Sequence, residues 1–320
     1  MIKFILLFTT MVLINVTHAQ SWPTKPVKIV VPFPAGGALD TVARNVGQKL
    51  SEIWKQPVLI DNKPGAGGNI GADAVAKAIP DGHTLFISPQ SLAISPSLYK
   101  KLPYDVNKDL IPVTQLMSSF LVLVVGPSVP ANSFNEFVSL AKSKPGVLNY
   151  ASTGLGSTPH LMMEMLMNNA KINITHIPYK GDAAMNQALL TGEVGAAFTP
   201  LVGVIGPMKS GKFRVLAITG TKRSPLIPDI PTITESKIEG FENSAGWLGI
   251  FAPSGTPPSI IKSIQTDFAK TMSYTDIKEK MPSWGYEAVG SSSEAFNIRF
   301  NSDIAQFSKL IKDAEIVLLD

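Results

Sequence analysis

The sequence has 320 residues, of which 45% are hydrophobic, a formal net charge of +4 and no cysteine. Without cysteine, disulfides, thiolate metal ligands, cysteine nucleophiles and a lipidated N-terminal cysteine are excluded. The charge is small, and no Lys/Arg block or basic patch with interleaved aromatics occurs, which argues against a nucleic-acid partner. A chain of about 300 residues is longer than a single hydrophobic core usually supports, so we expect two domains.

The N-terminus has the parts of a secretory signal peptide in the usual order. Lys3 gives a positive start, residues 4–14 form an apolar or small run, and Ala19 precedes the polar Gln20. The run is shorter than the roughly 20 residues that a membrane span needs, although a membrane anchor or a terminal strand is the alternative. We expect cleavage after Ala19, which leaves 320 − 19 = 301 residues and, without Lys3, a net charge of +3. The mature chain is then expected to diffuse in a bacterial periplasm.

The N-terminal half alternates strands with helices. Val27–Val31 is a β-branched run ended by prolines, and Val42, Val46 and Leu50 recur at helical spacing within 40–54. Further strands are predicted at 58–60 and 84–87, and an Ala-rich helix at 70–79. Strand–helix–strand repeats with short linkers imply a parallel sheet with helices on both faces.

A long apolar strand at 120–125 interrupts this pattern, and a second β/α series follows it. Strands are predicted at 148–151, 172–177, 194–199 and 214–219. Helices are predicted from Ser133 to Lys144, from Thr158, at 182–190 and 256–272, and at 291–311. Capping boxes at Ser133/Glu136 and Ser291/Glu294 are expected to open the first and the last of these helices.

The segment 247–257 repeats the pattern of 121–130, an apolar strand followed by Pro-Ser and by a proline that leads into a helix. We interpret the two segments as the points where the chain crosses between lobes, with chance similarity as the alternative. One lobe is then formed by 20–119 and 247–320, and the other by 120–246.

Loops that join a strand end to a helix start are the places where open α/β sheets collect ligands. The loop 32–40 offers Gly36 and Gly37, whose backbone N–H groups can approach an anion at a helix start. The loop 151–160 combines hydroxyls, glycines and a helix start, and is the best anion cradle in the chain. In that loop, His160 is expected chiefly to bond nearby backbone. In the loop 178–182, Tyr179 is predicted either to contact a ligand or to cap the core beneath it.

Three other chemistries fit poorly. The glycine-rich loop 64–71 lacks the acidic residue that a dinucleotide fingerprint needs at the end of the next strand, and 206–213 has P-loop spacing but ends in Phe213. Ser157 and His160 suggest a hydrolase pair, but the Gly-x-Ser-x-Gly motif is absent. The three histidines that remain after cleavage have no ligand-type spacing, so we expect no metal and no cofactor.

Several motifs in a fixed order resemble one family along essentially the whole mature chain. They are Val27 to Gly37 (VKIVVPFPAGG), Asp61 to Gly71 (DNKPGAGGNIG), Pro80 to Leu85 (PDGHTL), Ser152 to Leu161 (STGLGSTPHL), Pro178 to Gly181 (PYKG) and Ala252 to Pro257 (APSGTP). These motifs are similar to those of the substrate-binding receptors of tripartite tricarboxylate transporters, the Bug receptor family.

This resemblance implies an α/β, type II-like periplasmic binding protein, with two lobes, each a mostly parallel sheet flanked by helices, that close on a ligand in the cleft between them. It implies a small mono-, di- or tricarboxylate as ligand, membrane-embedded transporter subunits as partners, a monomer and no enzymatic activity. It also implies that the carboxylate is bound by the loop Ala35–Leu39 and by the Ser152–Thr158 loop of the other lobe, whereas Lys180 is interpreted chiefly as a solvated loop residue. The full set of candidate ligand residues is Ala35, Gly36, Gly37, Ala38, Leu39, Asp40, Gln90, Ser152, Thr153, Gly154, Ser157, Thr158, His160, Tyr179, Lys180 and Thr199.

The chain departs from the family pattern at Leu39, where threonine is frequent, at Met185, where proline is frequent, and at Thr199–Val202, where a small polar residue or Asp is frequent. These departures bear on which ligand is bound. Two alternatives remain at this stage: a sensing subunit that presents its closed form to a signalling kinase, and a secreted hydrolase that uses Ser157 or Asp182.

Overall fold

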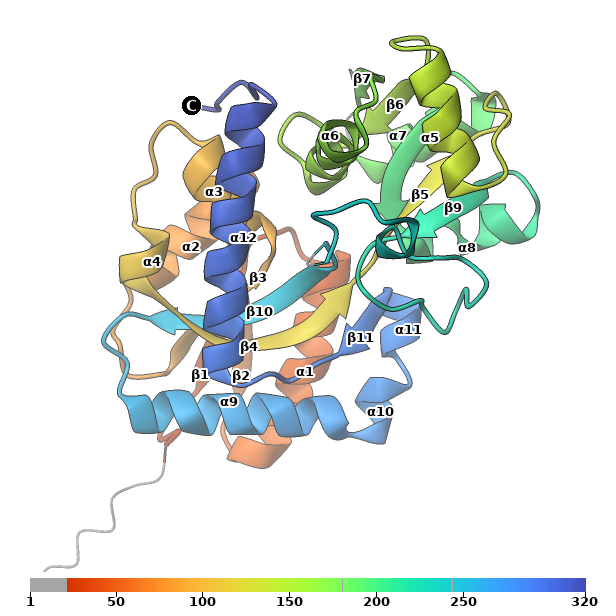
Figure 1. Cartoon of the computed structure of the whole chain (residues 1–320). Helices are drawn as coiled ribbons and strands as arrows, with labels where there is room; N and C mark the ends of the chain where they lie inside the picture. The colour runs from red at the N-terminus through yellow and green to blue at the C-terminus, as the bar shows by residue number, and fades with distance from the viewer. Residues whose placement is uncertain (1–21, 180, 243) are drawn as a thin grey trace, which may run out of the picture.

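The computed structural model describes residues 22–320 except Lys180 and Asn243. These residues form two α/β lobes, each built around its own sheet (Figure 1). The expected signal peptide, its cleavage site after Ala19 and the candidate ligand residue Lys180 lie outside the described residues.

Lobe 1 contains a six-stranded sheet in the order β11-β4-β10-β3-β1-β2. Its parallel part, in which β1 pairs with β2 and β3, comes from the β/α repeats predicted in the N-terminal half. β10 runs antiparallel to β3 and β4, and β11 antiparallel to β4. The strands are β1 (Val27–Val31), β2 (Val58–Asn62), β3 (Thr84–Pro89), β4 (Leu110–Ser119), β10 (Gly246–Pro253) and β11 (Tyr286–Ala288).

Lobe 2 contains a five-stranded sheet in the order β7-β6-β8-β5-β9. β6 is parallel to β7 and β8, whereas β5 is antiparallel to β8 and β9. Every residue of β5 is buried, as expected for an unbroken apolar run inside a sheet that is covered on both faces. The strands are β5 (Leu121–Val125), β6 (Asn149–Ser152), β7 (Thr175–Pro178), β8 (Ala196–Pro200) and β9 (Arg214–Ile218).

Helices cover both faces of each sheet. In lobe 1 they are α1 (Ala38–Trp54), α2 (Asn69–Ala76), α3 (Ser91–Leu98), α4 (Val106–Asp109), α9 (Pro258–Ser273), α10 (Thr275–Lys278), α11 (Met281–Trp284) and α12 (Ser293–Asp313). In lobe 2 they are α5 (Phe134–Ser143), α6 (Thr158–Ala170), α7 (Asp182–Thr191) and α8 (Leu201–Lys209). In the described part of the chain, no helix is both long enough and apolar enough to cross a membrane.

The alternation of strand side chains separates two apolar layers in lobe 1. Ile29 of β1 packs with α1 and α9, through residues such as Val46 and Phe268. The next residue, Val30, faces the opposite layer, which includes Phe296 of α12. Successive side chains of a strand point to opposite faces, so one short β-branched strand serves both layers.

The two crossings between the sheets lie side by side. The chain leaves β4 at Ser119 and enters β5 at Leu121, and it returns to lobe 1 at Gly246, which pairs with Ser119. In Figure 1, β4 runs toward this bridge between the lobes and β10 runs away from it. Two adjacent backbone crossings are the arrangement that permits rigid-body closure about a few residues.

The predicted cap of α12 is wrong by one residue. The helix begins at Ser293, and its N-cap is Ser292, whose side chain accepts a hydrogen bond from the N–H of Ala295. The hydroxyl of Ser291 instead accepts a hydrogen bond from the N–H of Gln115 in β4. Ser291, which the capping pattern favours, is therefore used in pairing with the sheet, and the next serine caps the helix. At α5 the expected Ser133 cap is present.

Candidate functional site

A cleft with a volume of about 530 Å³ lies between the two lobes. Lobe 1 lines it with the end of β3, with α3 and with Ser119, and lobe 2 with the start of α6, the start of α7 and Pro200. Its polar lining includes Gln90, Thr153, Ser157, Thr158 and Asp182.

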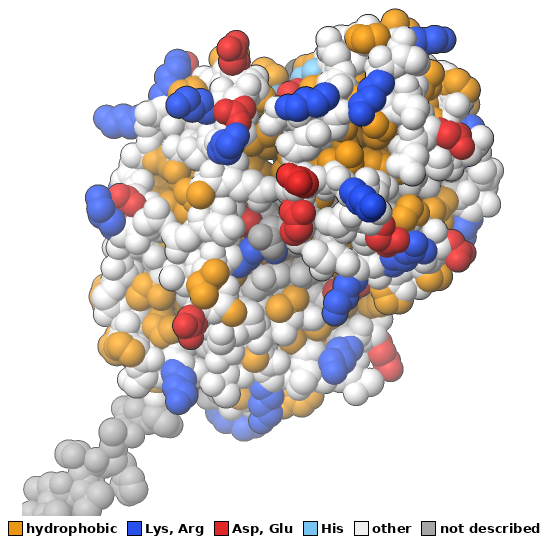
Figure 2. Space-filling view, viewed as in Figure 1, with side chains coloured by type: hydrophobic (Ala, Val, Ile, Leu, Met, Phe, Trp, Pro, Cys, Tyr) orange, Lys and Arg blue, Asp and Glu red, His pale blue; other side chains and the backbone are white. Residues whose placement is uncertain are grey.

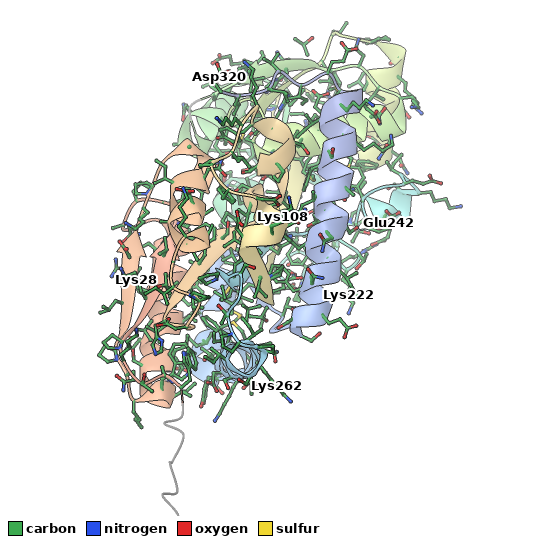
Figure 3. All side chains as sticks on the ribbon, turned by 90° about the vertical axis from the view of Figure 1, so that its left-hand side faces the viewer. Lys28, Lys108, Lys222, Glu242, Lys262 and Asp320 are labelled. Atoms are coloured by element: carbon green, nitrogen blue, oxygen red, sulfur yellow. The ribbon has the colours of Figure 1, made fainter. Side chains whose placement is uncertain are left out.

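Figure 2 shows basic and acidic side chains interspersed over one face of the molecule. In Figure 3, Lys28, Lys108 and Lys262 lie apart from one another on the side that faces the viewer.

The lobe 2 wall is a loop that ends β6 and begins α6. Three bonds fix its shape: the Ser157 hydroxyl donates to the carbonyl of Gly154 (2.7 Å), the Gly154 N–H to the Ser152 hydroxyl (3.1 Å), and the Gly156 N–H to His160 Nδ1 (3.0 Å). Gly154 and Gly156 have φ of +127° and +70°, which L side chains rarely adopt. The loop thus folds on itself ahead of α6, whose first turn carries unpaired N–H groups.

Two side chains of this wall are left for a ligand. The hydroxyls of Thr153 and Thr158 line the cleft and make no hydrogen bond with another residue in the described part of the chain. Pro159 follows Thr158 in the first turn, where the missing N–H of proline costs nothing. Hydroxyls and helix-start N–H groups are donors suited to a carboxylate.

A layer of aromatic rings supports this wall from beneath. The imidazoles of His160 and His176 stack with centroids 4.1 Å apart, and His176 stacks in turn on Tyr150 at 4.8 Å. His176 Nε2 lies 2.7 Å from the Ser152 hydroxyl, and the Tyr150 hydroxyl donates to Glu164 (2.7 Å). Burial, and secondarily the neighbouring His160, lower the pKa of His176 to about 4.

The first loop of lobe 1 is held by a buried acid. The Asp40 carboxylate accepts hydrogen bonds from Arg44 (2.8 Å), from the N–H of Gly36 (2.9 Å) and from Asn62 (3.0 Å). The Arg44 guanidinium, together with these backbone and amide donors, lowers the pKa of Asp40 to about 2. Residues 34–38 are exposed, and of this loop Phe33 lines the cleft. The Gly36 N–H is therefore used within the loop and is not free for an anion.

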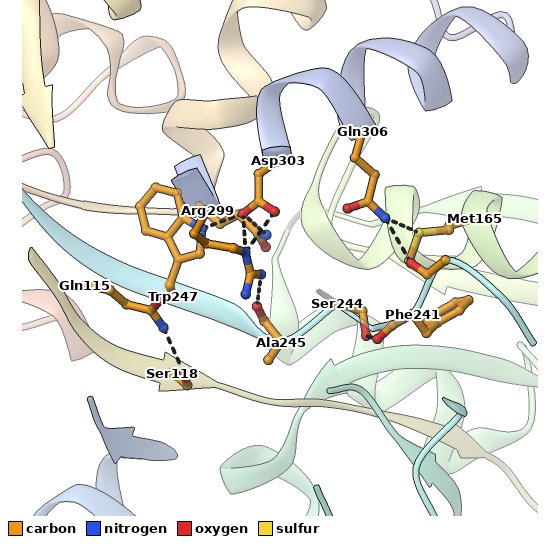
Figure 4. A network of polar contacts seen from close by, with 12 residues as sticks. Gln115, Ser118, Met165, Phe241, Ser244, Ala245, Trp247, Arg299, Asp303 and Gln306 are labelled. Atoms are coloured by element: carbon orange, nitrogen blue, oxygen red, sulfur yellow. Dashed lines mark hydrogen bonds and ion pairs between the residues drawn. The ribbon is translucent and has the colours of Figure 1, made fainter. Parts of the chain in front are cut away.

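The floor of the cleft rests on a buried ionic network (Figure 4). Asp303 of α12 is fully buried and accepts hydrogen bonds from Trp247 Nε1 (2.7 Å), Arg299 Nε (2.9 Å) and Gln90 Nε2 (2.9 Å). Arg299 also donates to the carbonyl of Ala245 (2.7 Å), in the segment that returns to lobe 1. Donors surround the carboxylate, as a buried charge requires.

The predicted ligand residues fall into three groups. Gln90, Thr153, Ser157 and Thr158 line the cleft. Ser152, His160 and Thr199 are buried behind its wall, and the Tyr179 hydroxyl donates to Glu193 (2.8 Å). The run from Ala35 to Asp40 and Gly154 are not part of the lining of this conformation, and Lys180 lies outside the described residues.

Two contributors to the site have no signal in the sequence pattern. Leu98 of α3 reaches across to the lobe 2 loop, where a Cβ on Gly156 would stand 2.6 Å from it. His176 lies on a strand with no motif, and it meets Ser152 only because β6 and β7 are adjacent. Both contacts depend on tertiary structure.

The geometry does not favour hydrolysis. Ser157 and His160, the pair suggested by the sequence, each bond to backbone within the loop. Ser152 and His176 are within hydrogen-bond distance, but Ser152 has no exposed surface from which to reach a substrate. Among the described residues, no group of three or more His, Cys, Asp or Glu could hold a metal ion.

Comparison with known proteins places these features in one family. Residues 42–316 match the tripartite tricarboxylate transporter family receptor. The chain belongs to this receptor family. Protein BugT of Bordetella pertussis is 38% identical over 245 residues, which are 76% of this chain and 75% of BugT.

Solved structures of similar proteins agree with this assignment. An R. palustris protein solved with adipate is 35% identical, with a TM-score of 0.78 over 93% of this chain and 100% of that one. The periplasmic binding protein BugD is 30% identical, with a TM-score of 0.75 over 93% and 100% of the two chains. The expected two-lobed α/β binding-protein fold is therefore confirmed. The tripartite tricarboxylate transporter receptors are solute-binding proteins of the periplasm, not an enzyme family.

Proposed function

We propose that this chain is a periplasmic receptor that captures a small mono-, di- or tricarboxylate by closure of its lobes and delivers it to membrane-embedded transporter subunits. The observation that carries the proposal is the cleft wall at the start of α6, where the hydroxyls of Thr153 and Thr158, free of partners in the described part of the chain, meet the N-terminal end of a 13-residue helix. Partial positive charge and unpaired N–H groups at such an end favour a carboxylate. The adipate-bound relative in the same family supports this ligand class.

In this proposal the carboxylate is held by hydroxyls and backbone N–H groups and not by an arginine clamp. Hydrogen bonds to a charged group contribute roughly 1.5–3 kcal/mol each, so three or four suffice for micromolar binding after association costs. The exposed residues 34–38 of lobe 1 join the ligand only when the lobes close, and Asp40 keeps that loop in shape. We further propose export by a signal peptide cleaved after Ala19, and a monomeric mature protein.

Titration calorimetry with a library of small carboxylates tests the proposal. Wild-type protein should bind at least one of them, and Ser157→Ala should weaken that ligand about tenfold or more, because it removes the hydrogen bond to the Gly154 carbonyl that holds the loop in its cradle shape. Ser143→Ala, an exposed serine at the end of α5, is the matched control and should bind as wild type does. Lys180→Met should cost less than tenfold. If Lys180→Met abolishes binding while Ser157→Ala does not, the cradle mechanism is wrong.

A further inference from the structure

The strand orders place the contacts between the lobes on two sides of the paired crossings. In lobe 1 the sheet continues from β10 to β3 and β1 on one side, and from β4 to β11 on the other. In lobe 2 it continues from β5 to β8 and β6 on one side, and to β9 on the other. The cleft is lined by residues at or just beyond the ends of β1, β3, β6 and β8. The strand β11 therefore lies on the side of the crossings that is opposite to the cleft.

A second contact between the lobes lies on that opposite side. Pro282 and Tyr286 of lobe 1 and Leu201 of lobe 2 line a small, mainly apolar pocket of about 90 Å³. The helix α11 contacts α8 there, and in Figure 1 it lies at the edge of lobe 1 nearest to α8. A Cβ on Gly285 would stand 3.1 Å from the Cβ of Val202, so the two backbones approach closely. Together these five residues form the rear contact.

Neighbouring side chains at the crossing face the cleft and the rear contact in turn. Ser119 and Leu121 line the cleft, whereas Phe120, which lies between them in the chain, lines the rear pocket. Likewise Pro200 lines the cleft, and the next residue, Leu201, lines the rear pocket. Successive side chains of an extended chain point to opposite faces, so the chain at the crossing separates the two spaces. The rear contact thus lies behind the hinge.

This position couples the rear contact to closure of the lobes. A rigid rotation about the crossings that narrows the cleft widens the opposite side. Closure therefore separates apolar surfaces that are packed together in this conformation, such as Leu201, which is 3% exposed. Burial of apolar surface stabilises the arrangement in which it is buried, here the one with the wider cleft. When the binding-competent closed form is only a fraction of the molecules, the apparent affinity for the ligand is reduced by that fraction.

We propose that the rear contact is a latch, which holds the free receptor open and so sets how tightly the carboxylate binds, although its residues do not line the cleft. The proposal rests on the proposed receptor function, in which the ligand is captured by lobe closure. Loosening the latch raises the affinity and locking it abolishes capture, while the groups that contact the ligand stay the same.

A disulfide across the rear contact locks the latch. The chain has no cysteine, so Val202→Cys combined with Gly285→Cys offers a single possible bond. The two Cβ atoms stand 3.1 Å apart, and a small shift brings them to the roughly 3.5–4.5 Å that a disulfide needs. Thiol titration verifies the bond. In calorimetry, the oxidised variant should bind the best carboxylate of the wild type at least about tenfold more weakly than its dithiothreitol-reduced form does, because it cannot populate the closed form. Gly285→Cys alone controls for the positive φ of +78°.

The Val202→Asn variant loosens the latch. Val202 is 40% exposed in the first turn of α8, so an amide of similar size is tolerated there, but its burial against α11 is unfavourable. It should bind the same carboxylate roughly threefold or more tightly than wild type, because the open form is less stable. Val147→Asn is the matched control, since Val147 is an exposed valine of lobe 2 that lines neither the cleft nor the rear pocket.

The two variants separate the latch from the receptor function. If the oxidised double variant binds as its reduced form does, or if Val202→Asn binds no more tightly than Val147→Asn, the latch is wrong and the receptor function stands. If wild-type protein binds no carboxylate of the library, the receptor function itself fails.

Discussion

At the scale of single residues, the imidazole of His176 makes the lobe 2 wall sensitive to acid. Its pKa lies at about 4 instead of the ordinary 6.5, because the ring is partly buried and faces His160. Between pH 6.5 and pH 4 the imidazole is protonated in the unfolded chain but not in the native state. The free energy of unfolding therefore keeps its full value above pH 6.5 and falls as the pH drops toward 4. With an allowance for the partial exposure of the ring, the loss at pH 5 is about 1–2 kcal/mol.

Urea unfolding at pH 7 and pH 5 measures this loss. The His176→Gln variant, which cannot titrate at this position, should lose about 1–2 kcal/mol less than wild type between the two pH values. An identical loss in the two proteins would show that the acid sensitivity arises elsewhere.

At the scale of elements, the sequence patterns predicted most strands and helices, because periodicity and prolines act locally. β4, ten residues long, was not predicted, and neither were α3 and β11. β4 contains Pro112 and polar residues such as Gln115, and it is stabilised by β10, more than a hundred residues away in the sequence.

In the candidate site, too, local features could be predicted from the sequence and tertiary contacts could not. Glycine and hydroxyl loops are visible as motifs, whereas the contacts of Leu98 and His176 come from packing that no local pattern encodes.

The loop before α6 also gives a prediction at this scale. Gly156→Ala adds a Cβ 2.6 Å from Leu98 of α3, so the lobe contact must shift, and the positive φ of +70° adds about 1 kcal/mol of strain. We expect this variant to bind its carboxylate more weakly than wild type. Adding Leu98→Ala makes room and should restore part of the affinity, measured by calorimetry. If the double variant binds no better than Gly156→Ala alone, crowding between the lobes is not the cause.

At the scale of the whole molecule, α12 ties lobe 1 to the segment that returns from lobe 2. Arg299 donates to the carbonyl of Ala245 (Figure 4), and Gln306 donates to the carbonyl of Gly240 (2.9 Å). The crossing itself is narrow, since Ser119 and Gly246 are paired neighbours. A narrow backbone bridge with one braced strand favours a hinge that moves the lobes as rigid bodies.

Closure should therefore be visible in solution. Small-angle scattering of wild-type protein saturated with its carboxylate should give a smaller radius of gyration than the free protein, because the cleft of about 530 Å³ narrows around the ligand. Ser157→Ala at a ligand concentration too low to saturate it should keep the radius of the free protein. An unchanged radius in wild type, with binding verified by calorimetry on the same sample, would mean that the ligand binds without lobe closure. The receptor would then have to be recognised by its transporter through a surface that the ligand itself completes.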